Sequence, residues 1–175
     1  MNTANKLTLF RMLLIPAFLV VLYIGFFGSQ YVAMVIFVAA GLTDIADGYI
    51  ARKRNEVTDF GKLMDPLADK ILVLAAMLWF LEQGVMPAWA VLIVVVREFL
   101  VTALRMIAVD NGRVIAAGIS GKIKTVVTMV CLTVMFLDLQ SWMLHICVAL
   151  ITITTIVSGI EYFIKNKDIF NWKKI

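Results

Sequence analysis

The amino-acid sequence predicts an all-α membrane protein with six transmembrane helices and both termini in the cytoplasm. Of its 175 residues, 62% are hydrophobic, and the mean hydropathy of +0.96 lies far above that of soluble globular domains. A bilayer-spanning helix needs roughly 20 mainly apolar residues, and six such stretches follow one another. They lie near residues 7–27, 31–52, 62–82, 87–109, 119–138 and 142–164. Because the connectors are short, residues 1–175 are predicted to form a single transmembrane domain.

The six stretches differ in the polar and small residues that they contain. The first runs into Gly25-Phe26-Phe27 rather than into the small residues of a cleavage site, so we expect a retained helix and no removed signal peptide. The second contains Ala39-Ala40-Gly41, which permits close helix packing within a subunit or across a dimer. Aspartates lie where the second and third stretches meet. The fourth contains two arginines, the fifth opens with two lysines, and the sixth carries Glu161 near its end.

Lysine and arginine are distributed unevenly over the connectors. The connectors near 26–30, 82–87 and 138–141 contain neither, whereas the other two connectors and both ends of the chain are basic. By the positive-inside rule, both termini and the basic connectors are predicted to face the cytoplasm. Topology and attraction to anionic lipid account for the lysines at the C-terminal end, so no nucleic-acid binding is predicted.

The second stretch ends in a segment with two carboxylates on one helical face. Asp44 and Asp47 are three residues apart, and Gly48 and Ala51 follow on the same face. Side chains as small as these leave space beside the carboxylates. A ligand is therefore expected there.

The third stretch opens with a second acidic face, on which Gly61, Asp65 and Asp69 are spaced four residues apart. The connector over residues 53–60 is short, so the two helices are predicted to be antiparallel neighbours that bring all four aspartates together. Ionised carboxylates near an apolar medium cost roughly a few kcal/mol each and repel one another, and all-oxygen ligation suits Mg²⁺ or Mn²⁺. We therefore expect bound divalent metal. The alternative is ion pairing with nearby cations, which are Arg52, Lys62, Lys70, Arg97 and Arg105.

These residues together form a recognisable motif. Asp44-x-x-Asp47-Gly48-x-x-Ala51-Arg52, followed after eight residues by Gly61-x-x-x-Asp65-x-x-x-Asp69, resembles the motif of the CDP-alcohol phosphotransferase family at every defining position. The six stretches and the opening Asn5-x-x-Thr8-x-x-Arg11 extend the resemblance. Three further segments are similar to the bacterial members whose acceptor is glycerol 3-phosphate. They are Arg97-Glu98-Phe99-x-Val101-Thr102-x-Leu104-Arg105, Gly121-Lys122-x-Lys124-Thr125 and Ser158-Gly159-x-Glu161-Tyr162.

The resemblance implies an activity and roles for individual residues. It implies transfer of a phosphatidyl group from CDP-diacylglycerol to glycerol 3-phosphate, by a homodimer in the plasma membrane of a bacterium with its active site facing the cytoplasm. Two Mg²⁺ or Mn²⁺ ions would be held by Asp44, Asp47, Asp65 and Asp69, and Asp69 would also be the general base. The CDP moiety would be bound by Thr8, Asp47, Gly48, Ala51, Arg52 and Gly61; for Arg52, a boundary residue that only snorkels is the alternative.

Four cations are candidates for binding the acceptor's phosphate. Arg97 and Arg105 lie within the fourth stretch, where an arginine facing lipid is costly, so they are expected to face a wet cavity. Lys122 and Lys124 open the fifth stretch on the same side of the membrane. The alternative is that the arginines pair with Glu98, with Glu161 or with the aspartates; Glu161 is expected to hold Arg97 or Lys122 in place.

Two other functions stay open on the sequence. The same chemistry would serve another acceptor, namely serine, inositol phosphate or phosphatidylglycerol. A divalent-cation transporter would use the aspartates as an ion relay, but such a site is expected near the bilayer midplane, whereas these carboxylates lie at the cytoplasmic ends of their helices.

Overall fold

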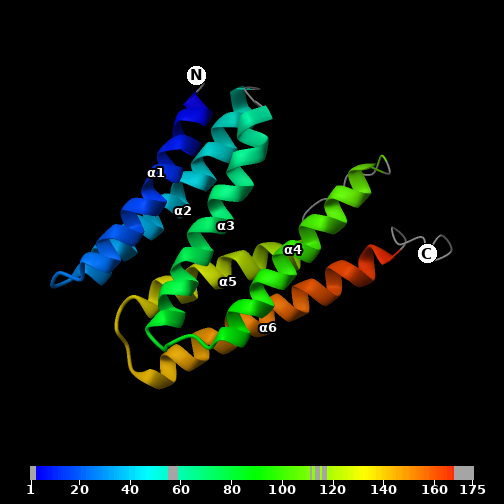
Figure 1. Ribbon diagram of the computed structural model, residues 1–175. Coiled ribbons are helices and arrows are strands. Elements are labelled where there is room, and N and C mark those ends of the chain that lie inside the picture. The colour runs from blue at the N-terminus through cyan, green and yellow to red at the C-terminus, as the bar shows by residue number, and fades with distance from the viewer. Residues whose placement is uncertain (1–2, 55–58, 111, 113–114, 116–117, 168–175) are drawn as a thin grey trace. The chain divides into compact units, whose positions relative to one another are not determined.

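The chain folds into six α-helices, and no strand occurs among the residues that the structure describes (Figure 1). The structure is a computed structural model that describes the backbone of residues 3–54, 59–110, 112, 115 and 118–167, and the side chains of residues 9–43, 67–109, 112, 115 and 118–167. The helices are α1 (Thr3–Ile24), α2 (Ser29–Arg54), α3 (Asp59–Glu82), α4 (Ala88–Asp110), α5 (Ile119–Met135) and α6 (Ser141–Lys165). The predicted helical class and the number of helices are confirmed.

The helix ends differ from the predicted ones where polar residues continue a helix or a glycine stops it. α1 begins at Thr3 rather than near residue 7 and ends at Ile24, because Gly25 adopts a φ of +65°, a left-handed conformation that glycine reaches without strain. α2 extends to Arg54 and α3 begins at Asp59, so both helices continue beyond the ends predicted at residues 52 and 62.

Only α6, among the described residues, is both long and apolar enough to cross a membrane by length and composition. Charge and length explain why two other helices fall short. α4 carries three charged residues within its apolar stretch, Arg97, Glu98 and Arg105, and α5 has 17 residues.

The chain divides into two compact units, and unit 1 comprises Met1–Trp79 and Leu132–Leu139. In this unit α1 packs along α2 (Figure 1). Its core is aromatic: the rings of Phe18 and Phe136 meet edge-to-face at 5.9 Å, and Phe37 lies about 6 Å from both. Trp79 stacks on Phe136 at 5.8 Å. Within the small-residue run of α2, Ala40 is fully buried and packs inside this unit, whereas Ala39 is exposed.

Unit 2 comprises Phe80–Cys131 and Gln140–Ile175, and in it α4 packs on α6. Val101 and Leu104 of α4 are buried against Tyr162 of α6. Val101 and Leu104 lie three residues apart on one face of α4, so that face is directed at α6.

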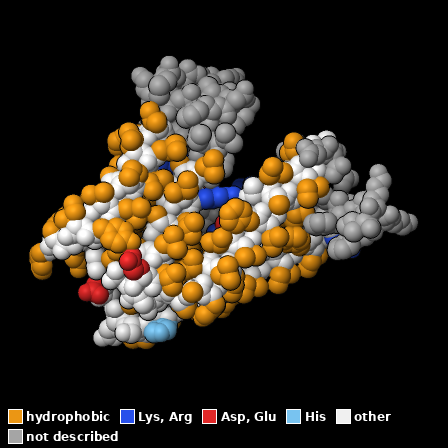
Figure 2. Space-filling view, in the orientation of Figure 1, with side chains coloured by type: hydrophobic (Ala, Val, Ile, Leu, Met, Phe, Trp, Pro, Cys, Tyr) orange, Lys and Arg blue, Asp and Glu red, His pale blue; other side chains and the backbone are white. Residues whose placement is uncertain are grey.

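Large hydrophobic side chains cover much of the outside of the described helices (Figure 2). Every helix contributes, with exposed examples at Leu13, Val35, Leu78, Phe99, Val126 and Ile153. A soluble monomer rarely exposes so much contiguous apolar surface, whereas lipid tails would cover it without cost. The surface is therefore that of a membrane-associated protein.

Candidate functional site

Both acidic segments are helical, as predicted. α2 continues to Arg54 and α3 begins at Asp59, so the spacing of the aspartates translates into shared helical faces. The half-buried Asp69 is described and has an interaction partner. The other expected metal ligands and nucleotide contacts have side chains outside the described residues; they are Thr8, Asp44, Asp47, Gly48, Ala51, Arg52, Gly61 and Asp65. Among the side chains that are described, no group of three or more His, Cys, Asp or Glu is placed to hold a metal ion.

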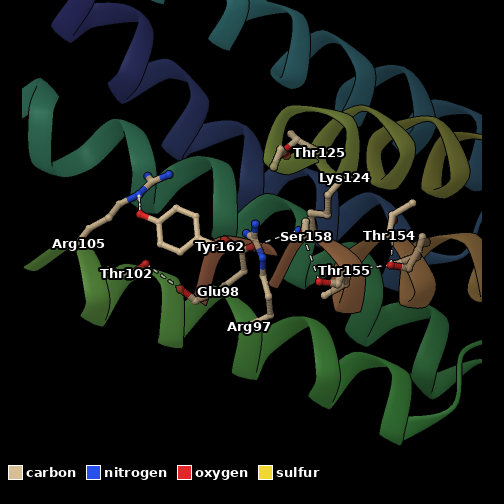
Figure 3. Close-up of polar contacts among 12 residues, drawn as sticks. Arg97, Glu98, Thr102, Arg105, Lys124, Thr125, Thr154, Thr155, Ser158 and Tyr162 are labelled. Carbon is tan, nitrogen blue, oxygen red and sulfur yellow. Dashed lines mark hydrogen bonds and ion pairs between the residues drawn. The ribbon is translucent and has the colours of Figure 1, made fainter. Parts of the chain in front are cut away.

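In unit 2, one carboxylate oxygen joins two cations (Figure 3). Glu98 Oε1 accepts a hydrogen bond from Arg97 Nη1 at 2.8 Å and another from Lys124 Nζ at 2.9 Å. Both contacts are ion pairs, and the exposed fractions of the side chains are 13% for Arg97, 25% for Glu98 and 7% for Lys124. Two cations and one carboxylate leave one net positive charge on a largely buried cluster. We call Arg97, Glu98 and Lys124 the cationic triad.

The bond to Glu98 uses only the Nη1 atom of the Arg97 guanidinium. Its Nε atom is buried and has no hydrogen-bond partner among the described residues. Buried polar atoms are nearly always hydrogen-bonded in folded proteins, so an unpaired guanidinium nitrogen indicates a place for an acceptor group that the described residues do not supply. An anion with oxygen acceptors, such as a phosphate, meets that requirement.

Two glycines lie against Arg97. A Cβ atom added to Gly159 of α6 would lie 3.2 Å from Arg97 Cγ, and one added to Gly121 of α5 would lie 3.6 Å from Arg97 Nη2. The first distance is shorter than an ordinary van der Waals contact and the second is ordinary. Arg97 therefore fits between α5 and α6 because position 159 has no side chain.

Arg105 is held separately, by Tyr162. Arg105 Nε donates a hydrogen bond to the Tyr162 hydroxyl at 3.1 Å, and its guanidinium carbon lies 5.6 Å from the centre of the tyrosine ring, within the range of a cation–π contact. The Arg105 side chain is exposed, while Tyr162 is buried. The tyrosine is thus a fixed support for a cation that reaches outward (Figure 3).

The four predicted acceptor-binding cations lie in different environments. Arg97 and Lys124 meet at Glu98, Arg105 lies on Tyr162, and Lys122 is exposed. The pairing of Arg97 with Glu98, named above as an alternative to phosphate binding, is present, and Arg97 Nε has no partner among the described residues.

The role expected for Glu161 was wrong. Glu161 forms its ion pair with Lys165, one turn further along α6, and Glu98 is the carboxylate that holds Arg97. An exposed pair four residues apart on a helix forms readily, which explains why Glu161 takes that local partner.

Among contributors to the site, Glu98 was named from the sequence only as an alternative partner of the arginines, and Tyr162 received no individual role. For Glu98 a signal existed: a carboxylate within an apolar stretch needs a cationic partner, and Arg97 and Lys124 were available. For Tyr162 no such signal existed, because tyrosine is also common in membrane helices at the membrane–water interface, where it needs no cationic partner.

The model of a protein family matches most of the chain. The model of the CDP-alcohol phosphatidyltransferase family matches residues 1–157. This range includes every aspartate of the motif and the whole cationic triad.

Similar proteins occur in several bacteria, and the similarity extends over nearly the full chain. A protein of Bacillus subtilis (strain 168) named CDP-diacylglycerol–glycerol-3-phosphate 3-phosphatidyltransferase is 38% identical over 190 aligned positions, which cover 94% of this chain and 95% of that protein. A protein of the same name from Shigella flexneri serotype 5b is 34% identical, with coverage of 90% and 88%. A Mycobacterium tuberculosis (strain ATCC 25618 / H37Rv) protein named "Probable phosphatidylglycerophosphate synthase" is 36% identical, with coverage of 92% and 79%.

Proposed function

This chain belongs to the CDP-alcohol phosphatidyltransferase family, and from that premise we propose that it transfers the phosphatidyl group of CDP-diacylglycerol to glycerol 3-phosphate, in phospholipid biosynthesis. The acceptor hydroxyl oxygen forms a new bond to the β-phosphorus, the bond from that phosphorus to CMP breaks, and the hydroxyl proton leaves to a base. The products are phosphatidylglycerophosphate and CMP. The observation that carries this proposal is the match, over 94% of the chain, to a relative named for this reaction.

The acidic segments of α2 and α3 are proposed to hold divalent metal. Their donor set consists of carboxylate oxygens only, at positions that share a helical face within each segment, and such a set suits Mg²⁺ or Mn²⁺. The four proposed ligands, for two ions, are Asp44, Asp47, Asp65 and Asp69. When bound, the metal supplies positive charge to a diphosphate that the bare carboxylates would repel.

Asp69 is the proposed general base, and the remaining motif residues are proposed to bind the nucleotide. A carboxylate on a helix has a fixed position, which general-base catalysis requires. The proposed contacts to the CDP moiety are Thr8, Asp47, Gly48, Ala51, Arg52 and Gly61. The two glycines among them would let the nucleotide approach the backbone.

The cations of unit 2 are proposed to bind the phosphate of the acceptor. The buried, unpaired Arg97 Nε and the exposed guanidinium of Arg105 supply the donors, and a guanidinium binds phosphate with two parallel hydrogen bonds. Lys122 and Lys124 add positive charge. Serine has no phosphate for these groups to bind, so the cations favour a phosphomonoester acceptor.

The helices are proposed to form a single domain of six membrane spans, with both termini and the active site on the cytoplasmic side of a bacterial plasma membrane. The apolar exterior (Figure 2) and the uneven distribution of lysine and arginine support this arrangement. The protein is further proposed to be a homodimer.

An acceptor panel tests the proposed function. Purified protein in detergent with CDP-diacylglycerol and Mg²⁺ or Mn²⁺ is expected to release CMP with glycerol 3-phosphate and not with serine, inositol phosphate or phosphatidylglycerol. The measurement is CMP release together with identification of the lipid product. No CMP release with any acceptor would contradict the proposed chemistry, and transfer to a different alcohol would contradict the acceptor.

The substitution Arg105→Ala is expected to raise the KM for glycerol 3-phosphate by about tenfold or more, because a charge-assisted hydrogen bond contributes about 1.5–3 kcal/mol. Tyr162→Phe keeps the ring and removes the hydroxyl that accepts from Arg105 Nε, so a rise of only about two- to tenfold is expected. The KM for CDP-diacylglycerol serves as the internal control. An unchanged KM for glycerol 3-phosphate in Arg105→Ala would count against a phosphomonoester acceptor.

A further inference from the structure

The bond between Arg97 and Glu98 is unusual, because the two residues are adjacent on a helix. Adjacent side chains on a helix point about 100° apart and do not normally meet. Here both turn toward the end of Lys124, which comes from α5 (Figure 3). Glu98 therefore fixes the place of one nitrogen of Arg97 relative to a second helix.

The nitrogen that Glu98 binds is Nη1, and this choice leaves a particular edge of the guanidinium available. Nε and Nη2 form the edge with two parallel N–H groups that matches two oxygens of a phosphate. Nε is buried without a partner among the described residues, and Nη2 lies near Gly121, where an added Cβ atom would be 3.6 Å away. Anchoring Arg97 through Nη1 thus leaves the N–H groups of this edge outside the bond to Glu98.

Gly159 controls the other end of the Arg97 side chain. A methyl group at position 159 would lie 3.2 Å from Arg97 Cγ, so the stem would have to move by a few tenths of an ångström. Alanine is the better helix former, and position 159 lies inside α6. The absence of a side chain at this position is explained by Arg97 and not by the needs of the helix.

We infer that Glu98 and Gly159 are positioning residues that hold Arg97 with its Nε–Nη2 edge directed at the phosphate of the acceptor. The inference rests on the proposed function for the identity of that acceptor. Glu98 acts through the carboxylate that Arg97 and Lys124 share, and Gly159 acts through the space it leaves for the stem.

The substitution Glu98→Gln tests whether Glu98 positions Arg97 or only neutralises positive charge. Without the carboxylate charge the two cations that share one oxygen repel each other and move apart, so the KM for glycerol 3-phosphate is expected to rise about tenfold, while the KM for CDP-diacylglycerol stays within about twofold. If Glu98 only neutralised positive charge, its removal would attract the anionic acceptor and lower that KM. A lowered or unchanged KM for glycerol 3-phosphate would overturn the inference.

A double-mutant cycle tests Gly159 without reliance on Glu98. Gly159→Ala is expected to raise the KM for glycerol 3-phosphate in the otherwise unchanged protein and to have no further effect in Arg97→Ala, because the added methyl group then meets no stem. The thermal unfolding midpoint is expected to show the opposite dependence: Gly159→Ala raises it only in Arg97→Ala, where the helix-forming advantage of alanine is no longer offset by contact with the stem of Arg97. Ile160→Ala, on the exposed side of the same turn, is the control and is expected to change neither quantity. Equal effects of Gly159→Ala in both backgrounds would overturn the role of Gly159.

Failure of this inference and failure of the proposed function give different results. If the unchanged protein releases no CMP with glycerol 3-phosphate, the proposed function is wrong, and the unfolding measurements still decide whether Gly159 and Arg97 are coupled. If the protein is active but positions 159 and 97 contribute additively, the function stands and the positioning role is wrong.

Discussion

Removal of divalent cations from the purified protein is expected to abolish CMP release, and added Mg²⁺ or Mn²⁺ is expected to restore it. The acidic segments are proposed to present four carboxylates to a diphosphate, and without metal these charges would repel each other and weaken binding of the donor. The measurement is CMP release after treatment with a strong chelator, followed by titration with each ion.

The substitution Asp44→Asn supplies a matched variant for the metal experiment. It keeps the size of the side chain and one oxygen, and it removes the charge that a divalent ion needs most. The ion concentration for half-maximal activity is therefore expected to rise, while Asp138→Asn, at an exposed position between α5 and α6, leaves it unchanged. Full activity in excess chelator would refute a role for metal.

The helices were predictable because each apolar stretch is a local property of the chain. Hydropathy over about 20 residues depends only on neighbours in sequence, and the ends are marked by residues such as Gly25, whose left-handed backbone stops α1. The start of α1 was misplaced because Asn5 and Lys6 lower the hydropathy of a segment that is nevertheless helical. Hydropathy locates the apolar part of a helix and not its polar extension.

The cationic cluster was only partly predictable because it depends on contacts between distant residues. The sequence identified the arginines of α4 from the cost of an arginine facing lipid and the lysines of α5 from their place on the same side of the membrane, but it could not say which carboxylate each would meet. Glu98 and Lys124 are 26 residues apart, and the bond from Arg97 to its sequence neighbour contradicts the usual spacing on a helix. Such pairings are decided by how α4, α5 and α6 pack.

Gly159 shows the same limit, because the sequence indicates a close contact there without identifying the partner. Within a helix a glycine is unfavourable by about 1 kcal/mol relative to alanine, so its presence signals some close approach. The sequence does not say what approaches. The structure identifies it as the stem of Arg97, from a helix 62 positions earlier in the chain.

The substitution Asp69→Asn is expected to lower kcat by about 10²–10⁴-fold, the usual contribution of a positioned general base. Asparagine keeps the shape of the side chain but cannot accept the proton that the acceptor hydroxyl releases. Asp69 is half-buried on α3 and has an interaction partner. The measurement is kcat at saturating substrates and saturating metal, so that a weakened metal site does not contribute to the loss.

The pH dependence of kcat distinguishes the two roles proposed for Asp69, which are general base and metal ligand. If Asp69 takes the proton, the fall of kcat on the acidic side of the profile reflects its protonation, and Asp69→Asn removes that limb as well as lowering the rate. If Asp69 only binds metal, raising the ion concentration restores kcat and the limb remains. Asp138→Asn is the control for loss of an aspartate, because its backbone φ of 51° is a conformation that asparagine tolerates. A rate for Asp69→Asn that excess metal fully restores would therefore assign the proton to another group.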